Sequence, residues 1–310
     1  MKLFALTALL TLTAAVLPAQ TKTRILLDTD PGTDIDDAWA LAFVALNPNF
    51  DTVAVTVTDA DTPARAKVAC KLLYRAGRTD IPVAIGRKTP TPNNRYDYQF
   101  TWSEDFTEYK PISEPAAQTI VRMAKKYPGE LVLLAVGPLQ NVADALRLEP
   151  QLGKYLKRVV LMSGNVYRRA DKEGIQPEWN VVASTQDAQL VYGAGLKMTI
   201  VPLDSTTLVK LSDTERDRVR KRASPVTHAV ESLYRLWLNA PQSRMTLHDQ
   251  LAVAEAARPG EFFGKKETLP LIVDDKGYTR IDKARGKDTV VCLEPKRDQF
   301  MEYYLSVLTK

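Results

Sequence analysis

The sequence predicts an α/β fold: one doubly wound domain with a mostly parallel sheet and helices on both faces. Short runs of Val, Leu and Ile alternate along the chain with amphipathic segments long enough to form helices. The short runs are almost continuously apolar, which is typical of parallel strands that are buried on both faces. No internal repeat, low-complexity tract or linker divides the 310 residues. We therefore expect a single domain.

The elements follow one another in a regular order. Strands are expected at residues 24–30, 52–58, 81–86, 130–136, 158–164 and 198–204, and helices at 36–46, 64–77, 116–127, 141–148 and 185–195. Residues 87–115 are rich in Pro, Asn, Tyr and Trp without a period, so they are expected to form a long surface loop. From Ser212 to about Ala257 the chain is helical in pattern. Short strands from Glu267 to Cys292 and a last helix near Asp298 to Leu308 complete the prediction.

The first residues have the pattern of a secretory signal peptide. Lys2 precedes an apolar segment that ends in small residues near Ala19. The segment is too short and wrongly flanked for a spanning helix, so we expect no stable membrane anchor; an uncleaved anchor is the alternative. The predicted division is a signal peptide at residues 1–19 and one domain at 20–310. The mature protein is then exported, to the periplasm or outside the cell.

Composition excludes other classes of function. The net charge is 42 − 37 = +5, and the basic residues are scattered without interleaved aromatic residues or a nucleic-acid motif. We therefore expect solvated helix faces and no nucleic-acid partner. The two cysteines, Cys70 and Cys292, lie in apolar patterns. They are either a disulfide pair or two buried free thiols.

An acidic stretch, DTDPGTDIDD at residues 28–37, carries the strongest chemical signal. Five carboxylates in ten residues repel one another unless a cation or a polar ligand binds them. Ca²⁺ accepts six to eight oxygen ligands, whereas Mg²⁺ demands stricter geometry. Capping of the following helix explains Asp36 and Asp37 but not all five residues.

Polar residues also follow other predicted strands, at 58–62, 135–141 and 162–165. Because ligands of open α/β sheets bind outside the carboxyl ends of the strands, we expect these segments to face one crevice.

The acidic stretch also resembles two other known motifs, and neither matches fully. A calcium loop of the EF-hand type needs flanking helices and a final Glu, and a haloacid-dehalogenase-type phosphotransferase does not usually have Pro31 and Gly32 after its second Asp.

The ordered set of motifs resembles the inosine–uridine-preferring nucleoside hydrolase family. That family opens with a strand, then Asp-x-Asp-x-Gly and an Asp-Asp pair before a helix, matched here by DTDPG and DDAWAL. Further matches follow in the family's order: GRTDIPVAIG, LLAVGPLQNVADAL, VVLMSG, PEWN and LHDQLAVA. The resemblance covers roughly Arg24 to Ala256. It implies a nucleoside hydrolase-like fold, with residues 20–310 as the catalytic domain.

The resemblance also implies a ligand set and substrate contacts. The implied ligands of Ca²⁺ are Asp30, Asp37, Asp249 and the carbonyl of Val136. The implied substrate-binding residues are Asp36 on a ribose hydroxyl, Asn180 and Glu178 on the 3′ and 5′ side of the sugar, and Met162 near it. Asp59 and Trp179 stand where the family usually has an amide and Phe, and they complete this set.

The chemistry implied is Ca²⁺-dependent hydrolysis of the N-glycosidic bond of a ribonucleoside to ribose and free base. Carboxylates stabilise the positive charge that develops on the sugar, Asp30 takes a proton from water, and His248 protonates the base. His228 is expected to be structural. The alternative is a non-catalytic, calcium-dependent ribose- or nucleoside-binding protein. A homodimer or homotetramer is also implied by the resemblance.

The chain departs from the family pattern in several places. The acidic loop is two residues longer than usual, so that Asp34 is extra and its role can be exchanged with that of Asp36. The segment before Glu178 lacks the family's Asn, and the loop after Gly86 lacks its His-Gly stretch. Metal and ribose binding follow from the resemblance, but the preferred base does not.

Overall fold

A single nine-stranded sheet organises the chain. The computed structural model describes residues 22–90, 97–167, 174–239 and 244–310. The predicted signal peptide at residues 1–19 lies outside the described residues. The strands are β1 (Thr23–Thr29), β2 (Phe50–Val57), β3 (Val83–Ile85), β4 (Val132–Ala135), β5 (Arg158–Met162), β6 (Met198–Val201), β7 (Phe263–Val273), β8 (Thr279–Ile281) and β9 (Lys287–Pro295).

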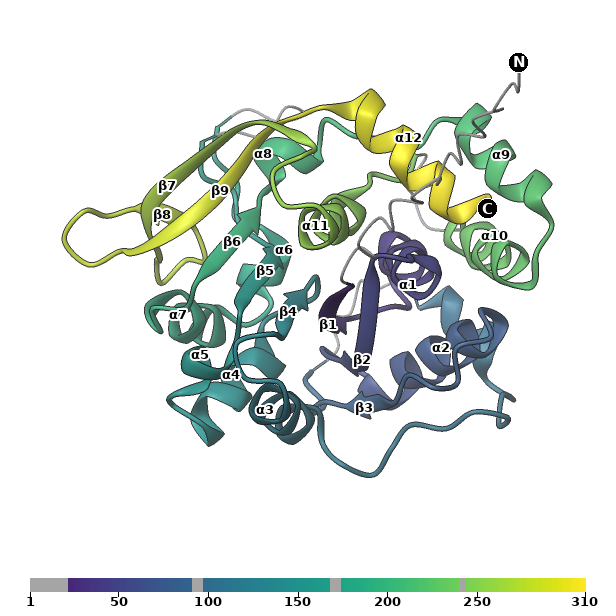
Figure 1. Ribbon diagram of the computed structural model, residues 1–310, viewed down its shortest axis with the longest axis horizontal. Helices are drawn as coiled ribbons and strands as arrows, with labels where there is room; N and C mark the ends of the chain where they lie inside the picture. Colours follow the sequence, from purple (N-terminus) through teal and green to yellow (C-terminus); the bar gives the residue numbers. More distant parts are fainter. Residues whose placement is uncertain (1–21, 91–96, 168–173, 240–243) are drawn as a thin grey trace, which may run out of the picture.

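Helices connect most of these strands (Figure 1). They are α1 (Asp36–Leu46), α2 (Thr62–Arg75), η1 (Tyr98–Ser103, a 3₁₀-helix), α3 (Ala116–Lys126), α4 (Gln140–Leu148), α5 (Leu152–Tyr155), α6 (Trp179–Val182), α7 (Thr185–Gly193), α8 (Leu203–Thr206), α9 (Asp213–Arg222), α10 (Pro225–Trp237), α11 (His248–Ala257) and α12 (Arg297–Leu308).

The strand order in the sheet is β3-β2-β1-β4-β5-β6-β9-β7-β8. The pairs from β3 to β9 are all parallel, and β7 pairs antiparallel with both β9 and β8. After β1 the chain moves to β2 and β3 on one side, and then returns to place β4 on the other side of β1. The carboxyl ends of β1 and β4 therefore flank a topological switch point, where open α/β sheets bind ligands.

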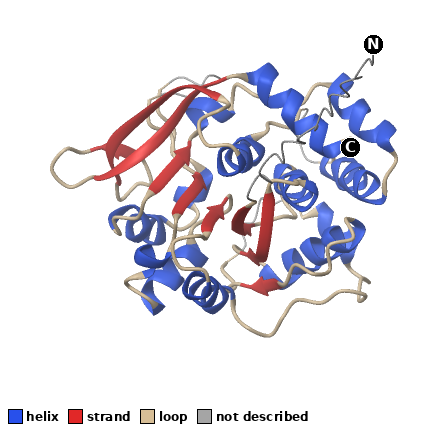
Figure 2. Cartoon of the chain, in the orientation of Figure 1, coloured by secondary structure: helices blue, strands red, loops and turns tan. Residues whose placement is uncertain are grey.

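Alternating side chains of the strands fill two cores. Ile25 and Leu27 of β1 belong to the core beneath α1, α2, α10, α11 and α12, whereas Leu26 belongs to the core beneath α3, α4, α5 and α7. Figure 2 shows the helices on both sides of the strands. This period of two, with both faces buried, is why the strand sequences are almost continuously apolar. The predicted doubly wound, mostly parallel architecture is confirmed.

Two predicted segments are wrong in detail. The strand expected at residues 198–204 ends at Val201, because Pro202 begins a turn that continues as α8. The stretch at residues 87–115, expected to have no regular structure, contains η1. Short helices of this kind have too few residues to show a period in the sequence.

Two further features concern the class of protein. No helix in the described part of the chain is long and apolar enough to cross a membrane. Cys70 in α2 and Cys292 in β9 are both buried and free. Of the two alternatives for the cysteines, the structure has the free thiols.

Candidate active site

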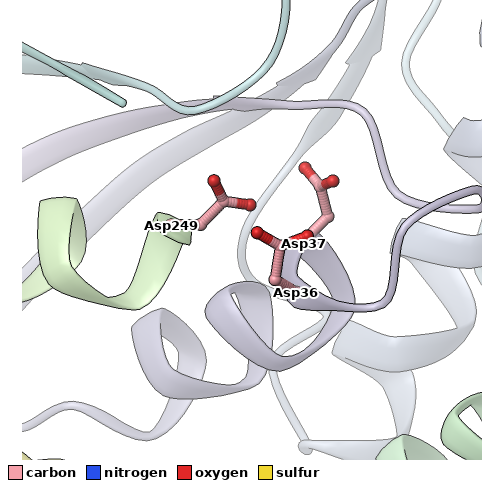
Figure 3. Close-up of side chains that lie close together, drawn as sticks. All are labelled: Asp36, Asp37 and Asp249. Carbon is pink, nitrogen blue, oxygen red and sulfur yellow. The ribbon is translucent and has the colours of Figure 1, made fainter. Parts of the chain in front are cut away.

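Three buried carboxylates meet at the switch point of the sheet. Asp36 and Asp37 lie in the first turn of α1, and Asp249 lies in the first turn of α11. Each offers a carboxylate oxygen within 4.8 Å of the others, and all three residues are buried. Figure 3 shows the three side chains around a common space between the two helix ends. We call Asp36, Asp37 and Asp249 the acidic cluster.

The two helix ends are tied together by the neighbour of Asp249. Gln250 is fully buried, and its Nε2 donates a 2.8 Å hydrogen bond to the backbone carbonyl of Asp36. Carboxylates at the N-terminus of a helix are favoured by the helix dipole, and two such ends point at the acidic cluster. This explains why Asp occupies the first turn of both helices, but it compensates only part of the negative charge.

The remaining repulsion is visible in the acidities of the cluster. Burial first, and then the nearby charges of Asp34, Asp37 and Asp30, hold the pKa of Asp36 well above its usual range. Burial first, and then the charges of Asp36, Asp37, Asp30 and Asp34, also raise the pKa of Asp249. All ligand atoms that the acidic cluster offers are carboxylate oxygens, the donors that hard cations prefer. The residues therefore fit a metal ion, which would relieve their repulsion.

Asp37 is held in place by the end of β1. Its Oδ1 accepts hydrogen bonds from the Thr29 hydroxyl at 2.6 Å and from the backbone N–H of Asp30 at 2.9 Å. Asp28, in the strand itself, is fully buried and accepts hydrogen bonds from Thr56 and Asn141. Burial raises the pKa of Asp28 to about 7, against the opposing effect of these two donors. Hydrogen bonds from β2 and from the start of α4 therefore fix the first residue of the acidic loop.

Asp30, near the start of the acidic loop (residues 28–37), faces the end of β4. A Cβ atom on Gly137 would lie only 2.6 Å from Asp30 Oδ1, so glycine at this position leaves room for the carboxylate. Asp30 is buried and raises the pKa of Asp36 and Asp249 through its charge. Asp30 is not one of the three residues of the acidic cluster, and its implied role as a ligand, like that of Asp36 on the sugar, stays a prediction.

The acidic loop is covered from outside by η1. Gln99 donates hydrogen bonds of 3.0 and 2.9 Å to the carbonyls of Thr33 and Asp34. Gly32 has a φ of 131°, which only glycine adopts readily, and the ring of Phe100 fills the space a Cβ would need. The side chain of the extra residue, Asp34, is exposed, while that of Asp36 is buried. The positions of these two residues are therefore distinct, although their roles stay a prediction.

The predicted sugar-binding residues converge at the ends of β4 and β5. Asn180 Nδ2 donates to the carbonyl of Val136 at 2.6 Å and to the carbonyl of Met162 at 3.1 Å. Glu178 caps α6 by accepting from the Asn180 N–H at 2.7 Å, and it also accepts from the Gly164 N–H at 3.1 Å. The carbonyl of Val136, predicted to be a metal ligand, is thus a hydrogen-bond acceptor of Asn180.

Trp179, predicted to bind the substrate, and His248, predicted to protonate the base, differ in exposure. Trp179 is 47% exposed, between the buried Glu178 and Asn180. His248, half-buried, precedes Asp249, and its Nδ1 lies 2.7 Å from the hydroxyl of Thr206 in α8. Sequence analysis missed Thr206, because the predicted strand ran through to residue 204. His228, which was predicted to be structural, is exposed on α10.

Arg65 in α2 is a second residue that sequence analysis missed. It is fully buried, and its Nη2 lies 3.3 Å from Asp59 Oδ2 and 3.6 Å from Asp30 Oδ2. A signal was present in the sequence: Arg65, Ala69 and Leu72 have the spacing of one helix face, and the last two residues are apolar. An arginine on a buried helix face needs an anionic partner.

Comparison with known proteins adds to this geometry. The family model described as inosine-uridine preferring nucleoside hydrolase matches residues 25–302. A protein of Arabidopsis thaliana named probable uridine nucleosidase 2 is 30% identical over 259 residues, covering 77% of this chain and 79% of its own. A non-specific ribonucleoside hydrolase of Salmonella newport is 29% identical over 270 residues, covering 83% and 85% of the two chains.

Solved structures have the same fold. A plant nucleoside hydrolase superposes with a TM-score of 0.81 at 22% identity, over 93% of this chain and 99% of that one. An inosine-uridine preferring nucleoside hydrolase from Bacillus anthracis superposes with a TM-score of 0.78 at 20% identity, over the same shares of the two chains. Since the family model spans nearly the whole domain, and the strand ends carry the family's motifs in order, this chain belongs to the inosine-uridine preferring nucleoside hydrolase family.

Proposed function

We propose that this protein hydrolyses the N-glycosidic bond of ribonucleosides, giving ribose and a free base, with Ca²⁺ bound by the acidic cluster. The observation that carries the proposal is the group of three buried carboxylates beside His248 at the switch point of the sheet. The names of the relatives, a probable uridine nucleosidase and a non-specific ribonucleoside hydrolase, support the same reaction. Ca²⁺ is favoured over Mg²⁺ because the donors are oxygens on separate helices, and Ca²⁺ tolerates irregular geometry.

The residues around the acidic cluster divide the chemistry between them. When bound, Ca²⁺ supplies a Lewis-acidic centre for the hydroxyls of the ribose and for water. Asp30, beside the acidic cluster, accepts the proton of the attacking water. Glu178 and Asn180 orient the ribose, and the surrounding carboxylates stabilise the positive charge that develops on it.

His248 completes the reaction by protonating the departing base. Its Nδ1 lies 2.7 Å from the Thr206 hydroxyl, and we assign protonation of the base to the other ring nitrogen, Nε2. Trp179, which is 47% exposed, supplies an aromatic surface next to Glu178 and Asn180.

The direct test is release of ribose from inosine and from uridine by the purified protein. Protein depleted with a chelator should be inactive, and Ca²⁺ should restore turnover better than Mg²⁺. Asp249→Asn is the matched control, because it keeps the shape of a cluster residue and removes its charge. Nucleoside binding without any release of ribose would instead indicate the non-catalytic binding protein.

We also propose that the protein is exported. The support is the Lys2-plus-apolar start, with small residues before Gln20. Mass spectrometry of the protein from its native source should give a chain that begins near Gln20. A full-length chain starting at Met1 in the cytosolic fraction would contradict export.

A further inference from the structure

Arg65 joins two strand ends that bear site carboxylates. Its Nε donates a 2.7 Å hydrogen bond to the backbone carbonyl of Asp59, and its Nη1 donates to the backbone carbonyl of Asp30. Its Nη2 faces the carboxylates of both residues. All three nitrogens of this buried guanidinium therefore contact the turns that follow β1 and β2. The ring of Phe100 lies 5.9 Å from the guanidinium carbon.

The turn that Arg65 holds is strained. Asp59 and Ala60 have φ values of 67° and 50°, in the left-handed region that residues other than glycine rarely adopt. Besides Arg65, the hydroxyl of Thr89 contributes, since it accepts from the Ala60 N–H at 2.7 Å and lies 3.3 Å from Asp59 Oδ1. Such strain persists only where the surroundings fix the conformation, and it is concentrated at functional sites. Arg65 and Thr89 provide that fixation here.

The position of Asp59 matters because of the charge around it. Asp59 is buried close to Asp30, which itself acts electrostatically on the acidic cluster. An additional unpaired carboxylate in this region would compete for a cation or repel its ligands. Lysine could supply the charge, but its donors all lie on one nitrogen atom, whereas arginine places donors on three separate nitrogens and so can contact both turns at once.

Building on the proposed function, we propose that Arg65 is a positioning residue. It fixes Asp30 for its role with water, and it pairs with Asp59 so that this carboxylate is not a ligand of the cation. Asp59 then acts through Arg65, in contrast to the direct substrate contact implied by the resemblance. Neither residue touches the reacting atoms in this assignment.

A double-mutant cycle tests the assignment. Arg65→Met should lower kcat on inosine about 100-fold, since displacements of about 1 Å at a site can have this effect. KM should change less than about threefold, because Glu178 and Asn180 are not contacted by Arg65. Asp59→Asn alone should lower kcat about fivefold. The double variant should regain about tenfold over Arg65→Met, because the carboxylate left unpaired is gone.

Two outcomes of the cycle would overturn the proposal. A double variant as slow as Arg65→Met would mean that Arg65 only supports the fold. An Asp59→Asn variant as slow as Arg65→Met would mean that Asp59 itself contacts the sugar or the cation. Arg65→Lys is the conservative comparison and should lie between the wild type and Arg65→Met. If Arg65→Met does not fold, the single Asp59→Asn variant still decides between the two roles of Asp59.

A binding measurement separates this proposal from the proposed function. By calorimetric titration with Ca²⁺, Asp59→Asn should stay within about threefold of the wild-type affinity, and Asp249→Asn should lose about 100-fold. Equal losses in these two variants would make Asp59 a ligand and refute the assignment. Absence of ribose release by the wild type would refute the proposed function, while the Ca²⁺ titration would still decide the role of Asp59.

Discussion

Stability of the metal-free protein should fall as the pH rises from 5 to 7, and Asp28 should account for a defined part of the change. Burial raises the pKa of this carboxyl from 3.8 to about 7. The folded chain therefore keeps the proton up to about pH 7, whereas the unfolded chain loses it near pH 4. Folding takes up a proton in this window, so the stabilisation present at low pH is lost as the pH rises.

The expected magnitude follows from this pKa difference. Well between the two pKa values the free energy of unfolding falls by about 1.4 kcal/mol per pH unit for one carboxyl. Because Asp28 is half-deprotonated in the folded chain at pH 7, the fall from pH 5 to 7 is about 2.3 kcal/mol. In a domain of this size 1 kcal/mol corresponds to roughly 2 °C in Tm, so the change is about 5 °C. Asp36 and Asp249, whose pKa values are also raised, add to the slope in the absence of metal.

Asp28→Asn isolates the contribution of Asp28. The amide keeps an oxygen for Thr56 and Asn141. Asp28 Oδ2 is buried without a hydrogen-bond partner, so an NH₂ group there costs stability equally at every pH. Thermal melting in a chelator, at half-unit steps from pH 5 to 7, gives the slope of each protein. Their difference cancels all other titrating groups, and equal slopes for the two proteins would refute the reasoning.

The remaining predictions concern the metal, the base and the sugar. Asp37→Ala should lower Ca²⁺ affinity at least about 100-fold with an unchanged circular dichroism spectrum, and a wild-type titration curve would remove Asp37 from the ligand set. Thr206→Val should lower kcat on inosine about tenfold but hardly affect p-nitrophenyl riboside, whose phenolate needs no proton; Thr206→Ser keeps the hydroxyl that contacts His248 and should be near normal. Ribonucleosides should be preferred over 2′-deoxynucleosides by at least about tenfold in kcat/KM, since a lost charge-assisted contact is worth about 1.5–3 kcal/mol. Equal values for inosine and 2′-deoxyinosine would argue against recognition of the 2′-hydroxyl.

The fold was predictable where side chains repeat with the period of an element. Ile25, Leu26 and Leu27 are apolar in succession because β1 is buried on both faces, and this pattern marks a central parallel strand. The positions of the polar strand ends followed from topology, since the carboxyl ends of β2, β1, β4 and β5 are neighbours in the sheet. Asp37 and Asp249 could be paired only through the resemblance, because nothing local connects them.

Other parts of the site depend on contacts that leave no periodic signal. Thr206 lies in a helix of four residues, and Gln99 lies in a 3₁₀-helix within a segment without a period. Arg65 shares a helix face with apolar residues, but the sequence does not show that its anionic partners are at the strand ends. Likewise, the grouping of Asp36 rather than Asp30 with Asp37 and Asp249 depends on the path of the loop, which no local pattern in the sequence predicts.

The contact between Gln250 and the carbonyl of Asp36 joins residues 214 positions apart in the chain. A cation held by Asp36, Asp37 and Asp249 would close the same long loop a second time, because it would link α1 to α11. Loop closure restricts the unfolded chain more as the loop lengthens, so a cross-link across this distance is among the most effective that the chain allows. The ion would then resemble a reversible disulfide between the two halves of the domain, and a chelator would act on it as a reducing agent acts on a cystine.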